Sequence, residues 1–146
     1  MFSLLKKRKH IKEAGKDPES IEIASSIILS IADKVQDAID AARHDVLFYV
    51  LYPELDPVIE KTPYVQRVSE IRKANAKGES KKALSLVSDD MVHDLAITGT
   101  PKECRNKVKR LKDYGITLPV IRVSVQPFQE NERREHFLRA IKALKQ

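Results

Sequence analysis

Residues 95–104 combine the residue types that end a strand, make a tight turn and begin a helix. Gly99 permits a sharp turn or a close backbone approach to a ligand. Thr100 is a good N-cap, Pro101 suits the first helical position, and Glu103 completes a Thr-x-x-Glu capping box. The free N–H groups of such a helix start attract anions, at the strand end where α/β proteins build active sites. Helix initiation alone also explains these residues, so a ligand contact and a purely structural turn are both open.

The other side chains able to do chemistry form no nucleophile–base set and no metal-ligand cluster. Cys104 is the only cysteine, so an internal disulfide is excluded. Its place in a first helical turn predicts a lowered thiol pKa, and its place on an apolar stripe predicts a packed small residue. Asp89 and Asp90 fit charges that complement a helix dipole better than a metal pair. The four histidines are expected on helix surfaces: His10, His44, His93 and His136.

Composition indicates one domain without a membrane span. The chain has 146 residues, 42% hydrophobic and 33% charged, and no apolar run approaches the length of a membrane helix. The net charge of +6 is partly concentrated in a basic cluster at residues 6–12. Because no nucleic-acid-binding motif accompanies this cluster, a solvated helix face is favoured over a nucleic-acid site. Cysteine usage and the absence of a signal peptide predict a cytoplasmic protein.

Periodicity and turn signals predict a helix followed by three strand–helix units. Asp33 is expected to cap the helix of the first unit, and the last helix is expected to bury Phe137, Leu138, Ile141 and Leu144. Between helix 34–51 and strand 95–98, residues 52–94 form an irregular helical insertion. Insertions of this length are often functional. The predicted elements are helix 3–14, strand 21–31, helix 34–51, strand 95–98, helix 101–113, strand 120–125 and helix 130–145.

Helical crossovers require the three strands to run parallel. Three parallel strands cannot close a barrel and leave two sheet edges unpaired. The sequence therefore predicts an α/β protein that forms part of something larger.

The order of these segments resembles the C-terminal part of the luciferase-like monooxygenases. The resemblance lies in residues 87–92, the turn at 96–104 and Tyr114-Gly115-Ile116, preceded by an Asp17-Pro18 turn and the strand at 21–31. It is greatest to the deazaflavin branch, which includes the methylenetetrahydromethanopterin reductases. It covers nearly all of this chain but only the last two-fifths or so of a family barrel.

The resemblance implies the C-terminal portion of a (β/α)8 TIM barrel, with residues 1–146 as one partial domain holding the sixth to eighth strands. It implies a deazaflavin coenzyme or FMN as cofactor, and hydride transfer between reduced cofactor and a small organic substrate. The first half of the barrel is missing, with most of the cofactor and substrate shell. The chain alone is therefore expected to be incomplete.

Within such a barrel, strand residues alternate between the lumen and the helix layer. Ile121, Val123 and Val125 are expected to face helices. Arg122, Ser124 and Gln126 are expected in the lumen, with Ser26 and Ser30 of the first strand. Arg122 could pair with an anionic cofactor or substrate group, or with a carboxylate of the protein itself. The predicted cofactor-binding residues are Gly99, Thr100, Arg122 and Ser124.

A second hypothesis is a non-catalytic interaction module that docks its sheet edges on another chain or on itself. A partner chain that supplies the missing half of the barrel, or a homo-oligomer, would cover those edges. A third hypothesis, a basic nucleic-acid binder, predicts affinity that falls steeply with salt.

Overall fold

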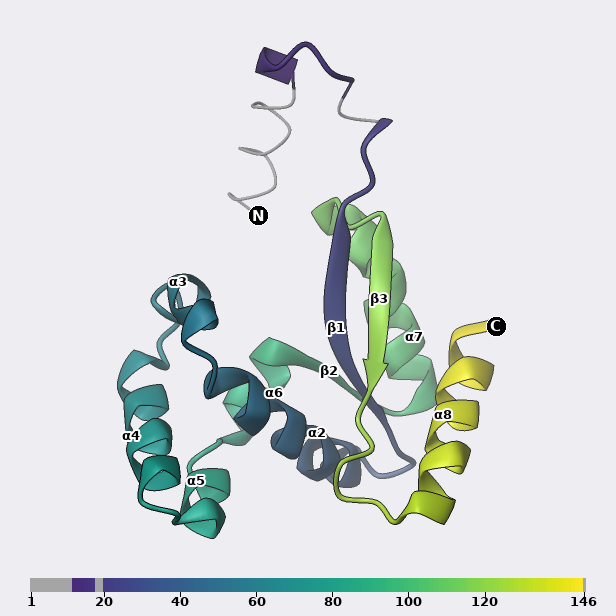
Figure 1. Cartoon of the computed structure of the whole chain (residues 1–146). Coiled ribbons are helices and arrows are strands. Elements are labelled where there is room, and N and C mark those ends of the chain that lie inside the picture. The colour runs from purple at the N-terminus through teal and green to yellow at the C-terminus, as the bar shows by residue number, and fades with distance from the viewer. Residues whose placement is uncertain (1–11, 18–19, 146) are drawn as a thin grey trace.

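The computed structural model describes residues 12–17 and 20–145. In this part of the chain, three parallel strands form one sheet: β1 (Ala24–Ile31), β2 (Ala96–Gly99) and β3 (Leu118–Val123). Helices flank the sheet, as Figure 1 shows. The predicted α/β fold with parallel strands is confirmed. The predicted helix 3–14 and the basic cluster lie largely outside the described residues.

The strands lie in the order β2-β1-β3, so the first strand is central. Ile28 pairs with Ala96 of β2 on one side and with Arg122 of β3 on the other. Consecutive strands of a closed barrel would instead place β2 in the middle. The assignment of these strands to barrel strands six to eight therefore stays a prediction, and the order of neighbouring strands differs from that in a barrel.

The connection from β2 to β3 returns across β1. Because both crossovers are right-handed, the helices of this connection lie on the opposite face of the sheet from those of the β1-to-β2 connection. Ile28 points into one core with Val46 and Val50 of the helix after β1. Its neighbour Leu29 points the other way, into a core with Cys104 and Ala140. Both faces of the sheet are thus covered by helices, and the described residues enclose no barrel lumen.

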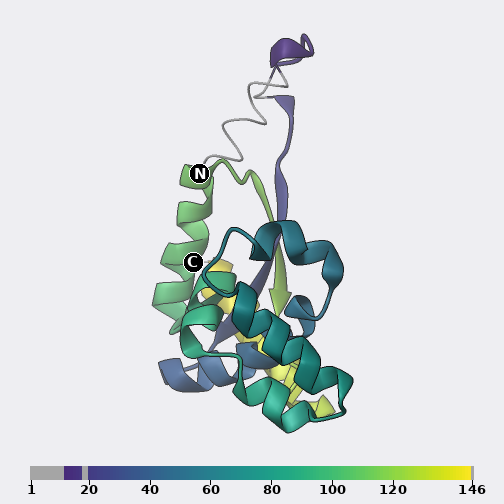
Figure 2. The ribbon, with the colours of Figure 1, turned by 90° about the vertical axis from the view of Figure 1, so that its left-hand side faces the viewer.

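The Ile28 face carries the longer connection, from β1 to β2. It contains α2 (Val35–Val50), η2 (Pro53–Leu55), α3 (Asp56–Ile59), α4 (Val65–Ala76), α5 (Ser80–Ser85) and α6 (Asp89–Leu95). Two arginines hold this region together. The Nε atom of Arg72 donates to the carbonyl of Val50 at 2.8 Å. Arg43 of α2 donates to the carbonyl of Val87 and pairs with Asp89. In Figure 2 these helices lie in front of the sheet.

The Leu29 face carries α7 (Pro101–Lys109), η3 (Arg110–Tyr114) and α8 (Glu130–Lys145). The prediction that α8 buries its large apolar residues was wrong for Phe137, Leu138 and Ile141, which are 44%, 45% and 47% exposed. Instead α8 buries Ala140 and Ala143, because these small residues let its backbone approach the sheet and α7. An apolar stripe is left uncovered on α8.

Among the described residues, no helix combines the length and the apolar character needed to cross a membrane.

Candidate functional site

The predicted site residues gather at the carboxyl edge of the sheet, because parallel strands all end on the same side. The N–H group of Ala32, directly after β1, donates to the carbonyl of Gly99 at 3.2 Å. On the other side of β1, the N–H group of Ser124 donates to the carbonyl of Leu29 at 2.8 Å. The ends of β2 and β3 therefore flank the end of β1. In doubly wound sheets this edge is where ligands bind.

The turn from β2 to α7 forms the capping box that the sequence predicts. The Thr100 hydroxyl accepts from the N–H of Glu103 at 3.4 Å. In return the Glu103 carboxylate accepts from the N–H and from the hydroxyl of Thr100, both at 2.8 Å. Gly99 has a φ of +143°, and a Cβ there would lie 2.7 Å from Oε2 of Glu103. This position therefore requires glycine.

The capping box also limits what this turn can bind. The bonds from Thr100 hold the pKa of the Glu103 carboxyl below its usual value of 4.5. The carboxylate is thus charged at neutral pH and lies against the helix start, where an anionic ligand would otherwise accept hydrogen bonds. An external anion at Gly99 and Thr100 would have to displace it or share its donors.

Arg122 lies on the α2 side of β3, next to a carboxylate of the protein itself. Its guanidinium is 3.4 Å from Oδ1 of Asp45, which is only 2% exposed. The same guanidinium lies 5.5 Å from the ring centre of Phe48 and 5.3 Å from that of Tyr49. The side chain is 38% exposed, so part of it stays open to a ligand. Ser26, farther along the same face, contacts the Tyr49 hydroxyl at 3.3 Å.

Buried polar side chains form a row across the sheet beneath α2. Thr98 pairs with Ser30 in the register, and Ser124 follows directly after the partner of Leu29. These three residues are 1%, 4% and 1% exposed. The hydroxyls of Thr98 and Ser124 and the Oδ2 atom of Asp45 are buried without a hydrogen bond. Such unpaired groups are costly, and in native proteins they often mark a functional region.

Burial raises the pKa of the Asp45 carboxyl above its ordinary value of 3.8, and nearby Ser124, Arg122 and His44 oppose this increase. Arg122, Asp45 and Ser124 therefore form an electrostatically perturbed group at the carboxyl end of β3. Such groups are typical of functional sites.

A crevice of about 390 Å³ opens at the end of β1, between α2 and α8. The α2 helix begins here at Lys34, whose side chain makes no capping bond. The prediction that Asp33 caps α2 was wrong. Asp33 instead pairs with Arg139 of α8 at 3.5 Å. The N–H groups of the first turn of α2 have no intrahelical acceptor, and the Lys34 side chain does not cap them.

Cys104 is not a reactive thiol. It is fully buried, and burial raises its pKa to about 11. The predicted lowering of its pKa was wrong, because desolvation outweighs the helix dipole at this site. Its packing in the core, the alternative, is confirmed. Among the described residues, no group of three or more histidine, cysteine or acidic side chains could hold a metal ion.

The sequence analysis missed three residues that contact Arg122: Asp45, Phe48 and Tyr49. Asp45 carries a signal that could have identified it. It follows Ala38 and Ala42 on the stripe of α2 that faces the sheet, so a charge stands among apolar residues. The two aromatic residues carry no such signal, because their contact with Arg122 depends on how β3 pairs with β1.

The fold and the site define an α/β protein built from parallel strand–helix units with polar groups at the carboxyl edge. The family model described as luciferase-like monooxygenase matches residues 5–118. The chain belongs to the luciferase-like monooxygenase family.

Two similar proteins are each named 5,10-methylenetetrahydromethanopterin reductase. The one from Methanopyrus kandleri (strain AV19) is 29% identical over 120 residues, which span 82% of this chain and 34% of the relative. The one from Methanolobus tindarius is 29% identical over 123 residues, spanning 82% of this chain and 37% of the relative. This chain thus spans about a third of the length of these relatives.

Two solved structures are similar to the fold. The coenzyme F420 dependent tetrahydromethanopterin reductase from Methanopyrus kandleri matches with a TM-score of 0.73 and 26% identity, covering 98% of this chain and 39% of that one. An F420-dependent secondary alcohol dehydrogenase, in complex with an F420-acetone adduct, matches with a TM-score of 0.59 and 23% identity, covering 95% and 37%. The second likeness concerns the fold alone.

Proposed function

We propose that this chain supplies the C-terminal strand–helix units of a deazaflavin-dependent oxidoreductase. The enzyme would transfer a hydride between the reduced cofactor and a small organic substrate. The observation that carries the proposal is the structural likeness to an F420-dependent reductase, at a TM-score of 0.73 over 98% of this chain. The similar reductase from Methanopyrus kandleri is coenzyme F420 dependent, which favours a deazaflavin over FMN. A cytoplasmic location stays a prediction of the sequence.

The proposed cofactor-binding residues are Gly99, Thr100, Arg122 and Ser124 at the carboxyl edge. The geometry gives them unequal roles. Arg122 keeps an exposed part and presents a delocalised cation close to two aromatic rings, so it suits a planar or anionic cofactor group. Gly99 and Thr100 shape the turn, because the N–H and hydroxyl of Thr100 already bond Glu103 and the carbonyl of Gly99 accepts from Ala32. The cofactor carries the hydride chemistry, and these residues bind and orient it.

A fluorescence titration of the folded chain with a deazaflavin, and separately with FMN, tests this proposal. Saturable binding of the deazaflavin that weakens about tenfold in Arg122→Ala would support it. Arg67→Ala is the matched control, because Arg67 is exposed on α4, far along the chain from the strand ends. No binding by a folded chain, or equal weakening in both variants, would reject the part of the proposal that concerns these residues.

A second candidate function, a module that works through a partner chain, is favoured by the apolar stripe on α8. Phe137, Leu138 and Ile141 are each more than two-fifths exposed. On β3, Leu118 and Val120 are 44% and 51% exposed. A partner chain that packs on these residues would bury them.

Sedimentation of the purified chain over a concentration series tests the partner hypothesis for self-association. A concentration-dependent dimer that Phe137→Ser converts to monomer would support it. Because Phe137 is exposed, this change should alter the free energy of unfolding by no more than about 0.5 kcal/mol. A monomer at all concentrations would exclude self-association and leave a different chain as the partner.

A further inference from the structure

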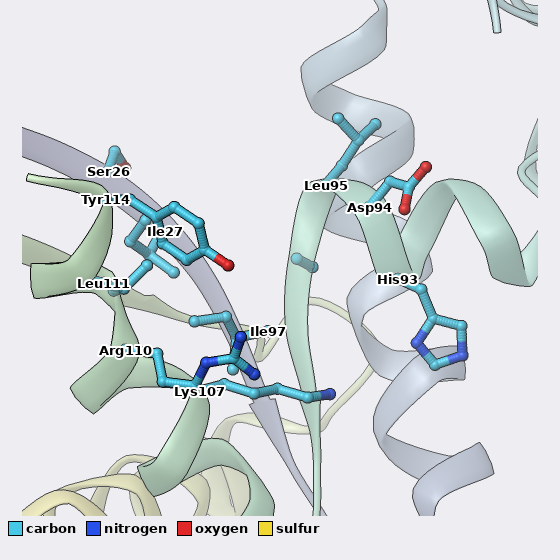
Figure 3. Close-up of a pocket in the computed structure, with 11 residues that line it drawn as sticks. Ser26, Ile27, His93, Asp94, Leu95, Ile97, Lys107, Arg110, Leu111 and Tyr114 are labelled. Atoms are coloured by element: carbon cyan, nitrogen blue, oxygen red, sulfur yellow. The ribbon is translucent and has the colours of Figure 1, made fainter. Parts of the chain in front are cut away.

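A hollow of about 400 Å³ lies along the outer edge of β2, near the beginning of that strand. Its walls come from the end of α6, from β1 and β2, and from the last turns of α7 and η3, as Figure 3 shows. It contains none of Gly99, Thr100, Arg122 or Ser124. The hollow is thus separate from the carboxyl edge and shares no residue with the proposed cofactor site.

The edge of β2 beside this hollow is already blocked against another strand. The N–H group of Ala96 donates to the carbonyl of Val92, at the end of α6. The Lys107 ammonium donates to the carbonyl of Thr98 at 2.8 Å. A lysine over a strand edge is a common way to prevent strand addition. These contacts favour a small molecule over a strand of a partner as a ligand for the hollow.

Two cations from the α7 side project into the hollow in Figure 3. Lys107 has three N–H donors, of which one bonds Thr98. The guanidinium of Arg110 forms no hydrogen bond or ion pair within the part of the chain that the structure describes. Of the described residues, Asp94 is the one acidic residue that lines the hollow, and it accepts from the Tyr64 hydroxyl at 2.6 Å, a bond that helps raise the pKa of Tyr64 to about 12. The hollow therefore has an excess of positive charge.

The rest of the lining is apolar and aromatic. Ile27, Ile97 and Leu111 contribute aliphatic surface, and Tyr114, which is 43% exposed, contributes a ring above them. The volume lies within the range of small-molecule sites. A guanidinium fork matches the two oxygens of a carboxylate, and an aliphatic wall with one ring matches a flat apolar body.

We propose that this hollow is a binding site for an aromatic carboxylate, held by Arg110 and Lys107 at its charged end and by Leu111 and Tyr114 along its ring. The carboxylate accepts hydrogen bonds from the exposed Arg110 guanidinium in place of water. The ring excludes water from Ile27 and Ile97.

Titration with benzoate, followed by amide chemical shifts or calorimetry at constant ionic strength, tests the site. The expected result is saturable binding that weakens about tenfold in Arg110→Gln. The matched control is Lys112→Gln, which removes one positive charge from the same turn but does not line the hollow. That control should change the affinity less than about twofold.

Two further probes separate the parts of the proposal. Benzyl alcohol keeps the ring without the charge, and acetate keeps the charge without the ring. Both should bind more weakly than benzoate. Absence of saturable benzoate binding, equal losses in Arg110→Gln and Lys112→Gln, or acetate binding as tight as benzoate would each overturn the proposal.

The Arg122→Ala variant distinguishes this site from the proposed cofactor site. Benzoate affinity should be unchanged in it, because Arg122 is not part of the hollow. If the chain binds benzoate but no deazaflavin, the inference about the hollow stands while the proposed function fails. A loss of benzoate binding in Arg122→Ala would contradict the separation of the two sites.

Discussion

The turns that follow β1 and β2 occupy equivalent positions in the fold but end their strands differently. After β2, Thr100 and Glu103 satisfy the start of α7 with a complete capping box. After β1, the helix begins at Lys34 without a capping side chain, and a crevice of about 390 Å³ opens beside it. We call the capped turn after β2 the closed turn and the uncapped turn after β1 the open turn. The difference teaches that a strong local helix-start motif can mark the closed turn rather than the open one.

This comparison changes where an anionic part of a ligand would be expected. The turn at Gly99 carries its own carboxylate, whereas the turn at Lys34 has no capping side chain and borders a crevice lined by Lys34 and Arg139. Asp33 and Asp37 also line the crevice and reduce its positive potential. A cofactor lying along the carboxyl edge would reach the β1 turn with less competition from the protein.

The largest effect is expected from Gly99→Ala. Its φ of +143° disfavours any other residue, and the new Cβ would lie 2.7 Å from Glu103 Oε2. We expect a loss of about 1–3 kcal/mol in the free energy of unfolding, measured by urea denaturation. Gly78→Ala is the matched control, because its φ is +73° and no atom lies within 4 Å of the new Cβ. A Gly99→Ala loss no larger than that control would show that the close approach of Glu103 carries no cost.

Thr100→Ala should lower the free energy of unfolding by about 1 kcal/mol, because the N-cap of α7 is lost. Asp33→Ala, at the equivalent turn, should change it by no more than about 0.5 kcal/mol, since Asp33 makes only a surface ion pair. Both values come from the same urea titration. Equal losses at the two turns would contradict the described difference in capping.

Lys34→Ser should raise the free energy of unfolding by about 0.5 kcal/mol, because serine at an N-cap can accept from the first turn of α2. Thermal or urea unfolding of the two proteins side by side provides the measurement. A destabilised Lys34→Ser would indicate that Lys34 itself contributes a contact that the open turn needs.

Acid should weaken the closed turn specifically. The bonds from Thr100 depress the folded-state pKa of Glu103 below 4.5, so its contribution is present above that pH and is lost as pH falls through the depressed value. Glu103→Gln should therefore flatten the pH dependence of unfolding below 4.5. Thr100→Ala, which removes the hydroxyl donor but keeps the N–H donor, should give an intermediate slope. An unchanged slope in Glu103→Gln would reject this account.

The features that the sequence predicted well depend on neighbours along the chain. The strands, most helices and the Thr100–Glu103 box follow from local periodicity and capping, which act over one or two turns. The confirmed capping box shows that a four-residue pattern can determine where a helix begins. The side-chain alternation of β3 was correct for Ile121 and Val123, which pack in the α7–α8 core. The expected lumen position of Arg122 was wrong, because α2 covers that face of the sheet.

The features that were missed depend on contacts between distant segments. An apolar stripe predicts that α8 packs against something, but not that Ala140 and Ala143 would form the contact instead of Phe137. The Arg122 contact with Asp45 requires β3 to lie beside β1, which no local pattern specifies. The predicted lowering of the Cys104 thiol pKa was wrong because desolvation is set by the folded core rather than by helix position.

The central position of β1 has a consequence for synthesis of the protein. Its partner β3 comes late in the chain, and the bond from the Ile23 N–H to the Thr117 hydroxyl joins residues that are 94 positions apart. At ribosomal speeds this separation corresponds to about 5–20 s during which one edge of β1 has no partner. Pairing over such a distance also slows folding. During this interval the unpaired edge of β1 is exposed to association with other chains.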